Sequence, residues 1–409
     1  MISKTVICLE NYPERREIKY MKTLGLYLHI PFCISKCAYC DFYSIPGTSE
    51  SMRQRYIDAM ISHMHEYSVQ AKDYVVTTIY FGGGTPSLMT GEQVKMIMKK
   101  IKSYFRVASN CEVSMELNPK TADFQKLKHF RKAGINRLSI GVQSFNEQDV
   151  RVCGRPHKAS DSFEVFTAAR KAGFNNISFD LMYGLPGQTL QSVIDNINTA
   201  IKLEPEHISL YGLKVEEGTP FWFDRHSLSF PDEDTERSMY FNCVGLMAAA
   251  GYNQYEISNF SKKGRQCRHN LKYWNCDEYL GFGPGAHSYF AGKRFSLKKN
   301  IGLYIDSFNP EKQVEEKLVD EYIDIPYSSR VAEYVMLRFR LTAGINCSTF
   351  RKKFGRNFED IYLNRITPYI NSGHIVKTKK GYAFTPAGMY VSNYILARVV
   401  DFDLIIPGT

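Results

Sequence analysis

The stretch Cys33-Ile34-Ser35-Lys36-Cys37-Ala38-Tyr39-Cys40 brings three thiols together in a short loop that directly follows a β-rich segment, residues 25–30. This spacing lets three thiolates fold around one cubic cluster, and thiolates are the usual protein ligands of iron–sulfur clusters. The fourth iron of a [4Fe-4S] cluster is then free to chelate the amino and carboxylate groups of S-adenosylmethionine (SAM). Reduction of that assembly can cleave the sulfonium and release a 5'-deoxyadenosyl radical. We therefore expect Cys33, Cys37 and Cys40 to hold such a cluster.

The three thiols also fit two alternatives to an iron–sulfur cluster. A zinc site would need a fourth ligand nearby, and His29 is close but is expected to be buried in the strand. A chance cluster of structural thiols is the second alternative. The glycine-rich segment 82–85, which ends the next predicted strand, favours the iron–sulfur cluster. Most of the remaining cysteines are expected to be small buried hydrophobic residues: Cys8, Cys111, Cys153, Cys243, Cys276 and Cys347.

A repeat of strands and helices surrounds the cysteine loop. The predicted strands are residues 25–30, 77–81, 111–117, 137–142, 177–182 and 207–214. The segments with helical apolar spacing are residues 52–67, 93–104, 122–133, 162–172, 190–201 and 233–249. Alternation of this kind gives a parallel sheet with right-handed crossovers. Polar residues stand at the carboxyl ends of several predicted strands, where barrel enzymes build their sites. The predicted fold class is therefore α/β, a partial (β/α)6 barrel with an open side.

The chain divides into four predicted parts. Residues 1–24 form an N-terminal extension, of which the first twenty are either poorly ordered or the product of an upstream start-codon assignment. Residues 25–250 form the partial barrel. Residues 251–325 form a connecting region rich in glycine and aromatic side chains. Residues 326–409 form a small C-terminal domain, in which helices at 330–339, 358–369 and 386–399 and a hairpin at 374–384 indicate a winged-helix-like fold.

Composition limits the class of protein. The 409 residues are 44% hydrophobic and carry a net charge of +10, with basic residues spread along the chain. The spread suits carboxylate-bearing small molecules at least as well as a nucleic acid, so no nucleic-acid partner is expected. No secretory or membrane-spanning segment is evident, and ten unevenly spaced cysteines favour a reducing cytoplasm. Formation of a homodimer is left open.

Six further motifs, together with the cysteine loop, indicate the protein family. They are YLHIPF (27–32), FGGGTP (81–86), ELNP (116–119), GVQSF (141–145), GRPH (154–157) and DLMYGLP (180–186). Together with the three cysteines they resemble the oxygen-independent coproporphyrinogen oxidase branch of the radical-SAM superfamily, which includes the HemN and HemW groups. The resemblance extends from about residue 25 to the C-terminus. It implies a radical-SAM barrel, a [4Fe-4S] cluster and bound SAM.

The resemblance also indicates which residues contact SAM. Carboxylates can accept hydrogen bonds from ribose hydroxyls or the ammonium, and amide or guanidinium groups can donate to the ribose and carboxylate. Gly83 and Gly84 would let the SAM amino group approach the backbone closely, although a tight strand-to-helix turn would account for them equally well. The candidate SAM residues are Tyr27, Tyr39, Gly83, Gly84, Thr85, Glu116, Gln143, Arg155, Asp180 and, more weakly, Lys214.

Two departures favour the HemW-like group within this branch. The oxidases carry a fourth cysteine two positions after the third, where this chain has Phe42, and they have a longer N-terminal segment. The HemW-like resemblance implies a chaperone that binds haem and delivers it to acceptor proteins. An oxygen-independent coproporphyrinogen III oxidase, or a related anaerobic porphyrin-modifying enzyme, is the main alternative, and a cluster-dependent DNA-binding regulator is a third. Whether SAM is cleaved stays open.

The segment HNLKYW (269–274) resembles a motif associated with haem in the same group. An imidazole can ligate haem iron, and aromatic rings offer flat apolar surface to a porphyrin. His269, Tyr273 and Trp274 are therefore the candidate haem residues, with His287 and Cys267 as further candidate ligands. The alternative is that His269 is a hydrogen-bonded histidine and that the aromatic side chains fill the core.

Overall fold

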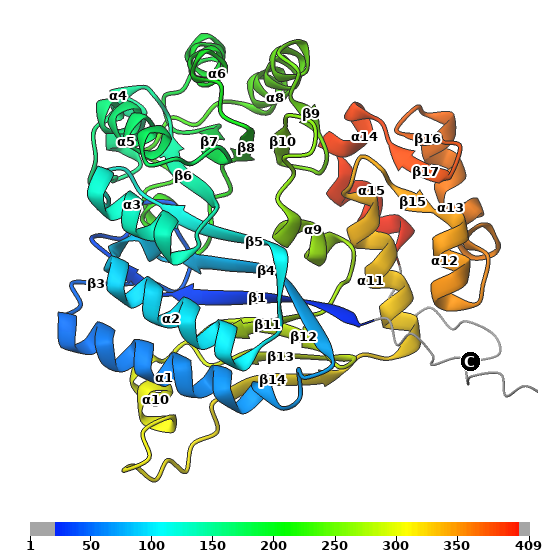
Figure 1. Ribbon diagram of the computed structural model, residues 1–409. Helices are drawn as coiled ribbons and strands as arrows, with labels where there is room; N and C mark the ends of the chain where they lie inside the picture. The colour runs from blue at the N-terminus through cyan, green and yellow to red at the C-terminus, as the bar shows by residue number, and fades with distance from the viewer. Residues whose placement is uncertain (1–20, 401–409) are drawn as a thin grey trace, which may run out of the picture.

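The computed structural model describes residues 21–400, and most of their strands form one large curved sheet with helices around it (Figure 1). The predicted extension 1–20 and residues 401–409 lie outside the described residues. The centre of the sheet is parallel and runs in the order β1-β4-β5-β6-β7-β8. Its strands are β1 (Lys22–Ile30), β4 (Tyr74–Gly83), β5 (Val107–Leu117), β6 (Arg137–Gln143), β7 (Ile177–Tyr183) and β8 (His207–Gly212). All six predicted strands are present, and the α/β partial-barrel fold class is confirmed.

Both edges of the sheet come from the segment 251–325, for which the sequence pattern predicts no strands. On one side β11 (Tyr279–Phe282) pairs parallel with β1, and three antiparallel strands follow it. On the other side the short strands β10 and β9 extend the sheet beyond β8. The added edge strands are β9 (Asn253–Gln254), β10 (Asn259–Ser261), β12 (His287–Phe290), β13 (Lys293–Leu297) and β14 (Val319–Asp324).

The helices form an outer layer around the parallel strands (Figure 1). Their buried faces carry apolar side chains at helical spacing, which is why the sequence pattern locates them. The long ones are α1 (Glu50–Ser68), α2 (Gly91–Tyr104), α3 (Phe124–Ala133), α5 (Ala159–Lys171), α6 (Leu190–Leu203) and α8 (Glu233–Ala249). The short ones are η1 (Pro86–Leu88), α4 (Glu147–Val152), α7 (Pro220–Phe223), α9 (Arg268–Trp274) and α10 (Ile301–Ser307). No helix within residues 21–400 is long and apolar enough to cross a membrane.

The C-terminal part of the chain packs around a second core, which includes Phe339, Phe350, Phe358 and Tyr362. Its helices are α11 (Tyr327–Phe339), α12 (Cys347–Phe354), α13 (Phe358–Asn371), α14 (Pro386–Tyr390) and α15 (Ser392–Val399). Its small sheet consists of β15 (Ile345–Asn346), β17 (Gly381–Phe384) and β16 (Ile375–Lys377). The predicted hairpin between two helices is therefore present. The pattern missed α12.

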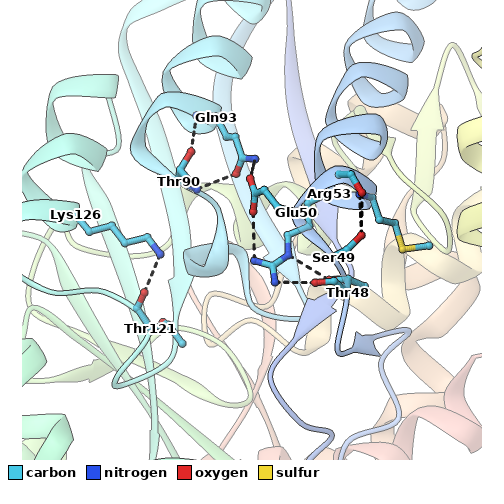
Figure 2. Close-up of polar contacts among 10 residues, drawn as sticks. Thr48, Ser49, Glu50, Arg53, Thr90, Gln93, Thr121 and Lys126 are labelled. Carbon is cyan, nitrogen blue, oxygen red and sulfur yellow. Dashed lines mark hydrogen bonds and ion pairs between the residues drawn. The ribbon is translucent and has the colours of Figure 1, made fainter.

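Polar contacts fix the chain where it leaves the cysteine loop (Figure 2). The strands β2 (Phe32–Cys33) and β3 (Ile45–Pro46) pair and close that loop. Arg53 then donates to the carbonyl and hydroxyl oxygens of Thr48 over 2.9 and 3.2 Å. Gln93 Nε2 donates to Glu50 Oε1 over 2.8 Å, and Gln93 also completes a capping box with Thr90. The first turns of α1 and α2 are thus tied together beside the cysteine loop.

Candidate functional site

A cavity of about 490 Å³ opens between the cysteine loop and the carboxyl ends of the parallel strands. The alternation of strand residues accounts for its lining. In β6, Leu138, Ile140 and Val142 join the apolar core, whereas Arg137 and the alternate residues after it line the cavity. Most of the predicted site residues meet there: Cys33, Cys37, Tyr39, Cys40, Gly83, Gly84, Thr85, Glu116, Gln143, Arg155, Asp180 and Lys214. Tyr27, His269, Tyr273 and Trp274 do not line it.

The three cysteines of the loop are free thiols at the edge of the cavity. Cys33 Sγ lies 3.4 Å from Thr85 Oγ1, and Arg155 Nη1 donates to Cys37 Sγ over 3.5 Å. Burial raises the pKa of Cys33, and it raises the pKa of Cys40 to about 11. A cationic metal centre would reverse this effect, because coordination deprotonates a thiol. The donor set therefore fits a cluster that is held by three thiolates.

The zinc alternative finds no support within the described residues. No group of three or more histidine, cysteine, aspartate or glutamate side chains there converges closely enough to hold a single metal ion. A tetrahedral zinc site needs such convergence. A [4Fe-4S] cluster does not, because each of its thiolates binds a different iron. The lack of such a group among the described residues therefore does not count against a cluster.

Glu116 lies at the end of β5 and is held by two donors. Its Oε1 accepts a hydrogen bond from the Tyr80 hydroxyl over 3.0 Å, and its Oε2 accepts one from the Gly83 backbone N–H over 3.1 Å. Burial, with the nearby charge of Asp180, raises the pKa of Glu116 to about 7. The carboxyl group can therefore accept or donate a hydrogen bond near neutral pH.

Arg155 connects the cysteine loop with the strand ends. Its Nη2 donates to Asn118 Oδ1 over 2.8 Å and to the Gly141 carbonyl, while Nη1 approaches the Tyr39 hydroxyl at 3.4 Å. Nε has no partner among the described residues. The guanidinium is largely engaged by protein groups, and it places a positive charge beside Cys37.

The remaining predicted SAM residues occupy different depths of the cavity. Asp180 accepts hydrogen bonds from Ser139 over 3.0 Å and from Ser178 over 3.3 Å, and burial raises its pKa. Gln143 has a φ of 63° where the register shifts between β6 and β7, so a local bulge ends the strand at this residue. Lys214 lies two residues beyond β8, is 80% exposed and pairs with Glu216 at 2.6 Å. The prediction that β8 extends to Lys214 was wrong.

Close packing explains why residues 83 and 84 are glycines. Gly83 has a φ of +111°, and a Cβ there would lie 2.6 Å from the imidazole of His29. A Cβ on Gly84 would lie 2.8 Å from the Phe32 carbonyl oxygen, and the Gly84 N–H donates to the Ile30 carbonyl over 2.8 Å. A tight turn therefore accounts for both glycines. Any contact of SAM with this backbone is an additional role.

The HNLKYW segment lies behind the cavity. His269 is 1% exposed, and both of its ring nitrogens are engaged, one with Thr78 Oγ1 at 2.9 Å and one with the Tyr273 hydroxyl at 2.8 Å. The expectation that His269 offers an open nitrogen to haem iron does not match this geometry, which agrees with the alternative of a hydrogen-bonded buried histidine. Trp274 faces Arg340 of the C-terminal part. Only Asn270 of this segment lines the cavity.

The other candidate haem ligands, Cys267 and His287, do not line the cavity. Cys267 is fully buried at the start of α9, with its Sγ 3.8 Å from Glu112 Oε1. Tyr27, a predicted SAM residue, is half-buried and does not line the cavity, and its hydroxyl lies 3.1 Å from His29 Nδ1. His287 is exposed at the start of β12.

Several cavity residues were not predicted from the sequence. They are Tyr80, Asn118, Arg137, Ser139, Ser209, Tyr211 and Asn270. For Tyr80, Asn118 and Ser139 a signal was available, because each lies two or four positions before or after a predicted site residue, as neighbours on one face of a strand do. Asn270 had no such signal, since its place depends on how α9 packs under the barrel.

Two family models match the chain. The first is described as "Radical SAM superfamily" and matches residues 27–200. The second is described as "HemN C-terminal domain" and matches residues 329–391.

Curated relatives match over nearly the whole chain. A protein of Bacillus subtilis (strain 168), named "Heme chaperone HemW", is 36% identical over 376 residues, which cover 90% of this chain and 97% of the relative. Proteins of the same name from Haemophilus influenzae and Escherichia coli (strain K12) are 34% and 32% identical, each over 91% of this chain and 97% of the relative.

Among solved structures, one described as "Coproporphyrinogen III oxidase (HemN) from Escherichia coli is a Radical SAM enzyme" is similar with a TM-score of 0.80. It is 22% identical, and the match covers 94% of this chain and 92% of that chain. This similarity supports the fold.

Proposed function

The chain belongs to the HemW family of radical-SAM proteins, and on that premise we propose that it is a haem chaperone, which binds a [4Fe-4S] cluster, SAM and haem and delivers haem to acceptor proteins. The observation that carries the proposal is the cavity, where three free thiols face polar strand-end residues. Its volume lies in the range of small-molecule sites. The family membership is the reason for proposing haem in addition to the [4Fe-4S] cluster and SAM.

Each side chain at the cavity has a proposed part in binding. Cys33, Cys37 and Cys40 would hold the cluster, which when bound supplies the electron for any cleavage of SAM. Glu116 and Asp180 would accept hydrogen bonds from the ribose hydroxyls or the ammonium of SAM. The fixed dipoles and charges around them would orient SAM without large rearrangement, since Glu116 already has two protein donors.

Two features favour carriage of haem over coproporphyrinogen oxidation. Phe42 occupies the position where the oxidases resembled by this chain have a fourth cysteine. Phe42 is 64% exposed and Ile34 is 53% exposed, and both stand on the cysteine loop at the cavity. Exposed apolar side chains of this kind offer surface to the plane of a porphyrin.

The decisive experiment uses the full chain, reconstituted with iron and sulfide under anaerobic conditions. We expect haem titration to give a saturable Soret band and the loaded protein to transfer haem to an apo-haemoprotein. With SAM, a reductant and coproporphyrinogen, we expect no protoporphyrinogen. Turnover of coproporphyrinogen would instead establish the oxidase, and lack of saturable haem binding would refute the chaperone proposal.

Three variants define where haem binds in the same titration. Phe42→Ser should weaken haem binding about fivefold to tenfold, because roughly 1 kcal/mol of apolar contact is lost. Phe223→Ser is the matched control, since Phe223 is 72% exposed on α7 and does not line the cavity. His269→Gln should leave the Soret spectrum unchanged, because both imidazole nitrogens are already engaged. A lost Soret shift in that variant would restore His269 as the iron ligand.

A further inference from the structure

Arg137 is a buried cation at the cavity that lacks a hydrogen-bonding partner. It begins β6, is 1% exposed and lines the cavity. Its Nε and Nη1 have no hydrogen-bond acceptor, and no ion pair with Arg137 is found within the described residues. Buried guanidinium groups are normally paired, so an open one beside a cavity is unusual and indicates a partner from outside the chain.

Glu112 is one candidate for a protein partner, and its carboxylate is used elsewhere. Burial opposes the charge of Arg137, but Cys267 and then Glu112 are the groups that do most to raise its pKa. Yet the oxygens of Glu112 accept hydrogen bonds from the backbone N–H groups of Arg268 and His269, each over 3.1 Å. Glu112 thus caps the start of α9, and it does not accept a hydrogen bond from Nε or Nη1 of Arg137.

The two other carboxyl groups that face Arg137 are likewise supplied with donors. Glu116 is held by Tyr80 and Gly83, and Asp180 is held by Ser139 and Ser178. Burial raises the pKa of both carboxyl groups, and for Glu116 the pKa of about 7 reduces the negative charge near neutral pH. An incoming anion would therefore meet less repulsion than two full carboxylate charges would give.

Two other cations that line the cavity, Arg155 and Lys214, are already engaged, and a third, Lys36, is exposed on the cysteine loop. Arg155 donates to Cys37, Asn118 and the Gly141 carbonyl. Lys214 pairs with Glu216 and is mostly exposed. Among the buried cations that line the described cavity, Arg137 alone has an unused guanidinium fork.

We propose that Arg137 is the binding residue for a carboxylate group of a ligand that reaches the inner end of the cavity. A guanidinium presents two parallel N–H donors, which match a carboxylate in bidentate geometry. Neutral polar side chains also line the cavity, among them Tyr80, Ser209 and Asn270. This inference rests on the proposed function, which supplies two carboxylate sources, a haem propionate and the methionine part of SAM.

The position of Arg137 within β6 favours the propionate. Parallel strands place their carboxyl ends at the cysteine loop, and Arg137 stands at the opposite end of β6, before Ser139 and Gly141. The carboxylate of SAM is expected to stay near the cluster, whereas a propionate is a flexible arm that can extend inward. The two sources are nevertheless separable by experiment.

The test compares ligands with and without their carboxylates. Wild-type protein and the variants Arg137→Met and Arg137→Lys are titrated with haem, haem dimethyl ester, SAM and decarboxylated SAM. For the wild type we expect haem to bind at least tenfold more tightly than its ester, as for a hydrogen bond to a charged group. Arg137→Met should bind haem and its ester equally, and Arg137→Lys should show an intermediate preference.

Each outcome decides the assignment. A preference for the carboxylate that disappears in Arg137→Met supports it, and the pair of ligands affected identifies the source. The assignment is overturned if the affinities for all four ligands fall equally, or if Arg137→Met still prefers the ligands that carry a carboxylate. Should Arg137→Met fail to fold, as judged by thermal unfolding, Arg137→Lys and the wild-type comparison still decide. If wild type binds haem and its dimethyl ester with equal affinity, only the assignment of Arg137 is refuted. If wild type binds neither ligand, the proposed function is refuted too.

Discussion

At the scale of single residues, Gly83 shows how conformation and space together restrict the site. Its φ of +111° lies in a region that residues with a Cβ rarely adopt, and the His29 ring occupies the place of that Cβ. His29 is itself fixed, because its Nε2 lies 2.9 Å from the Tyr43 carbonyl oxygen. The Gly83 N–H in turn donates to Glu116. A change at this residue should therefore disturb both the turn and a proposed SAM residue.

We predict that Gly83→Ala lowers the free energy of unfolding by more than ~2 kcal/mol, through backbone strain and overpacking against His29. Gly187→Ala is the matched control. Gly187 has a φ of +78°, but nothing lies within 4 Å of its Cβ position. Gly187→Ala should lower the free energy of unfolding only by the cost of a positive φ for alanine, about 1 kcal/mol. Urea unfolding measures both values, and equal losses would show that the His29 contact has no energetic consequence.

At the scale of elements, the joined first turns of α1 and α2 support the cysteine loop (Figure 2). Thr90 and Gln93 satisfy each other's backbone N–H groups, and Gln93 also holds Glu50 at the start of α1. A capping box of this kind contributes to the helix start and, here, to the contact between two helices. The stability of α2 should therefore depend on Thr90.

We predict that Thr90→Ala lowers the free energy of unfolding by about 1 kcal/mol, because the Gln93 N–H loses its acceptor. Thr167→Ala is the control, since Thr167 is exposed within α5 and its hydroxyl donates to the Phe163 carbonyl in its own helix. That control should stay within about 0.5 kcal/mol of wild type. Chemical denaturation distinguishes the two, and a neutral Thr90→Ala would contradict the capping role.

The elements that the sequence predicts are those whose burial is periodic along the chain. The six parallel strands and the long helices repeat apolar residues, so their places were predictable, and the three cysteines located the site. The strands β9 to β14 were not predictable in this way. Several have only two to four residues, and β14 (Val319–Asp324) is exposed at every position.

The surroundings of His269 were unpredictable for a different reason. Its partner Thr78 lies 191 residues away in the chain, so no local pattern announces the contact. The motif resemblance made His269, Tyr273 and Trp274 the candidate haem residues, and none of the three lines the cavity. Packing of α9 beneath the barrel turns His269 into the core and leaves Asn270 at the cavity. The composition and spacing of a motif therefore do not determine the direction of its side chains.

At the scale of the whole molecule, the barrel and the C-terminal part have separate cores that meet at a contact region with apolar and polar contacts. Arg294 of β13 pairs with Glu333 of α11, and Arg338 donates to Asn275. Glu256 forms an isolated bridge with Leu341. These contacts join the barrel side of the molecule to the C-terminal part (Figure 1).

Glu256 makes this contact region sensitive to pH. Glu256 is fully buried, its Oε1 has no partner among the described residues, and its Oε2 accepts from the Ser258 N–H over 3.2 Å. Burial, partly offset by hydrogen bonds, raises the pKa of Glu256 from 4.5 to about 7. Between these two values the unfolded chain has released a proton that the folded chain retains. The contribution of Glu256 to stability is thus complete below pH 4.5 and is lost as the pH rises through about 7.

We predict that Glu256→Gln becomes more stable relative to wild type as the pH rises from about 5 to 8, by up to about 3 kcal/mol. Absolute stability curves also contain opposite contributions from buried histidines such as His63, whose pKa is lowered to about 3. The measured quantity is therefore the difference in unfolding free energy between variant and wild type at each pH. The exposed Glu311→Gln should give a constant difference. Parallel curves for Glu256→Gln and wild type would mean that Glu256 is ionised in the folded protein, and that the contact region between barrel and C-terminal part admits water.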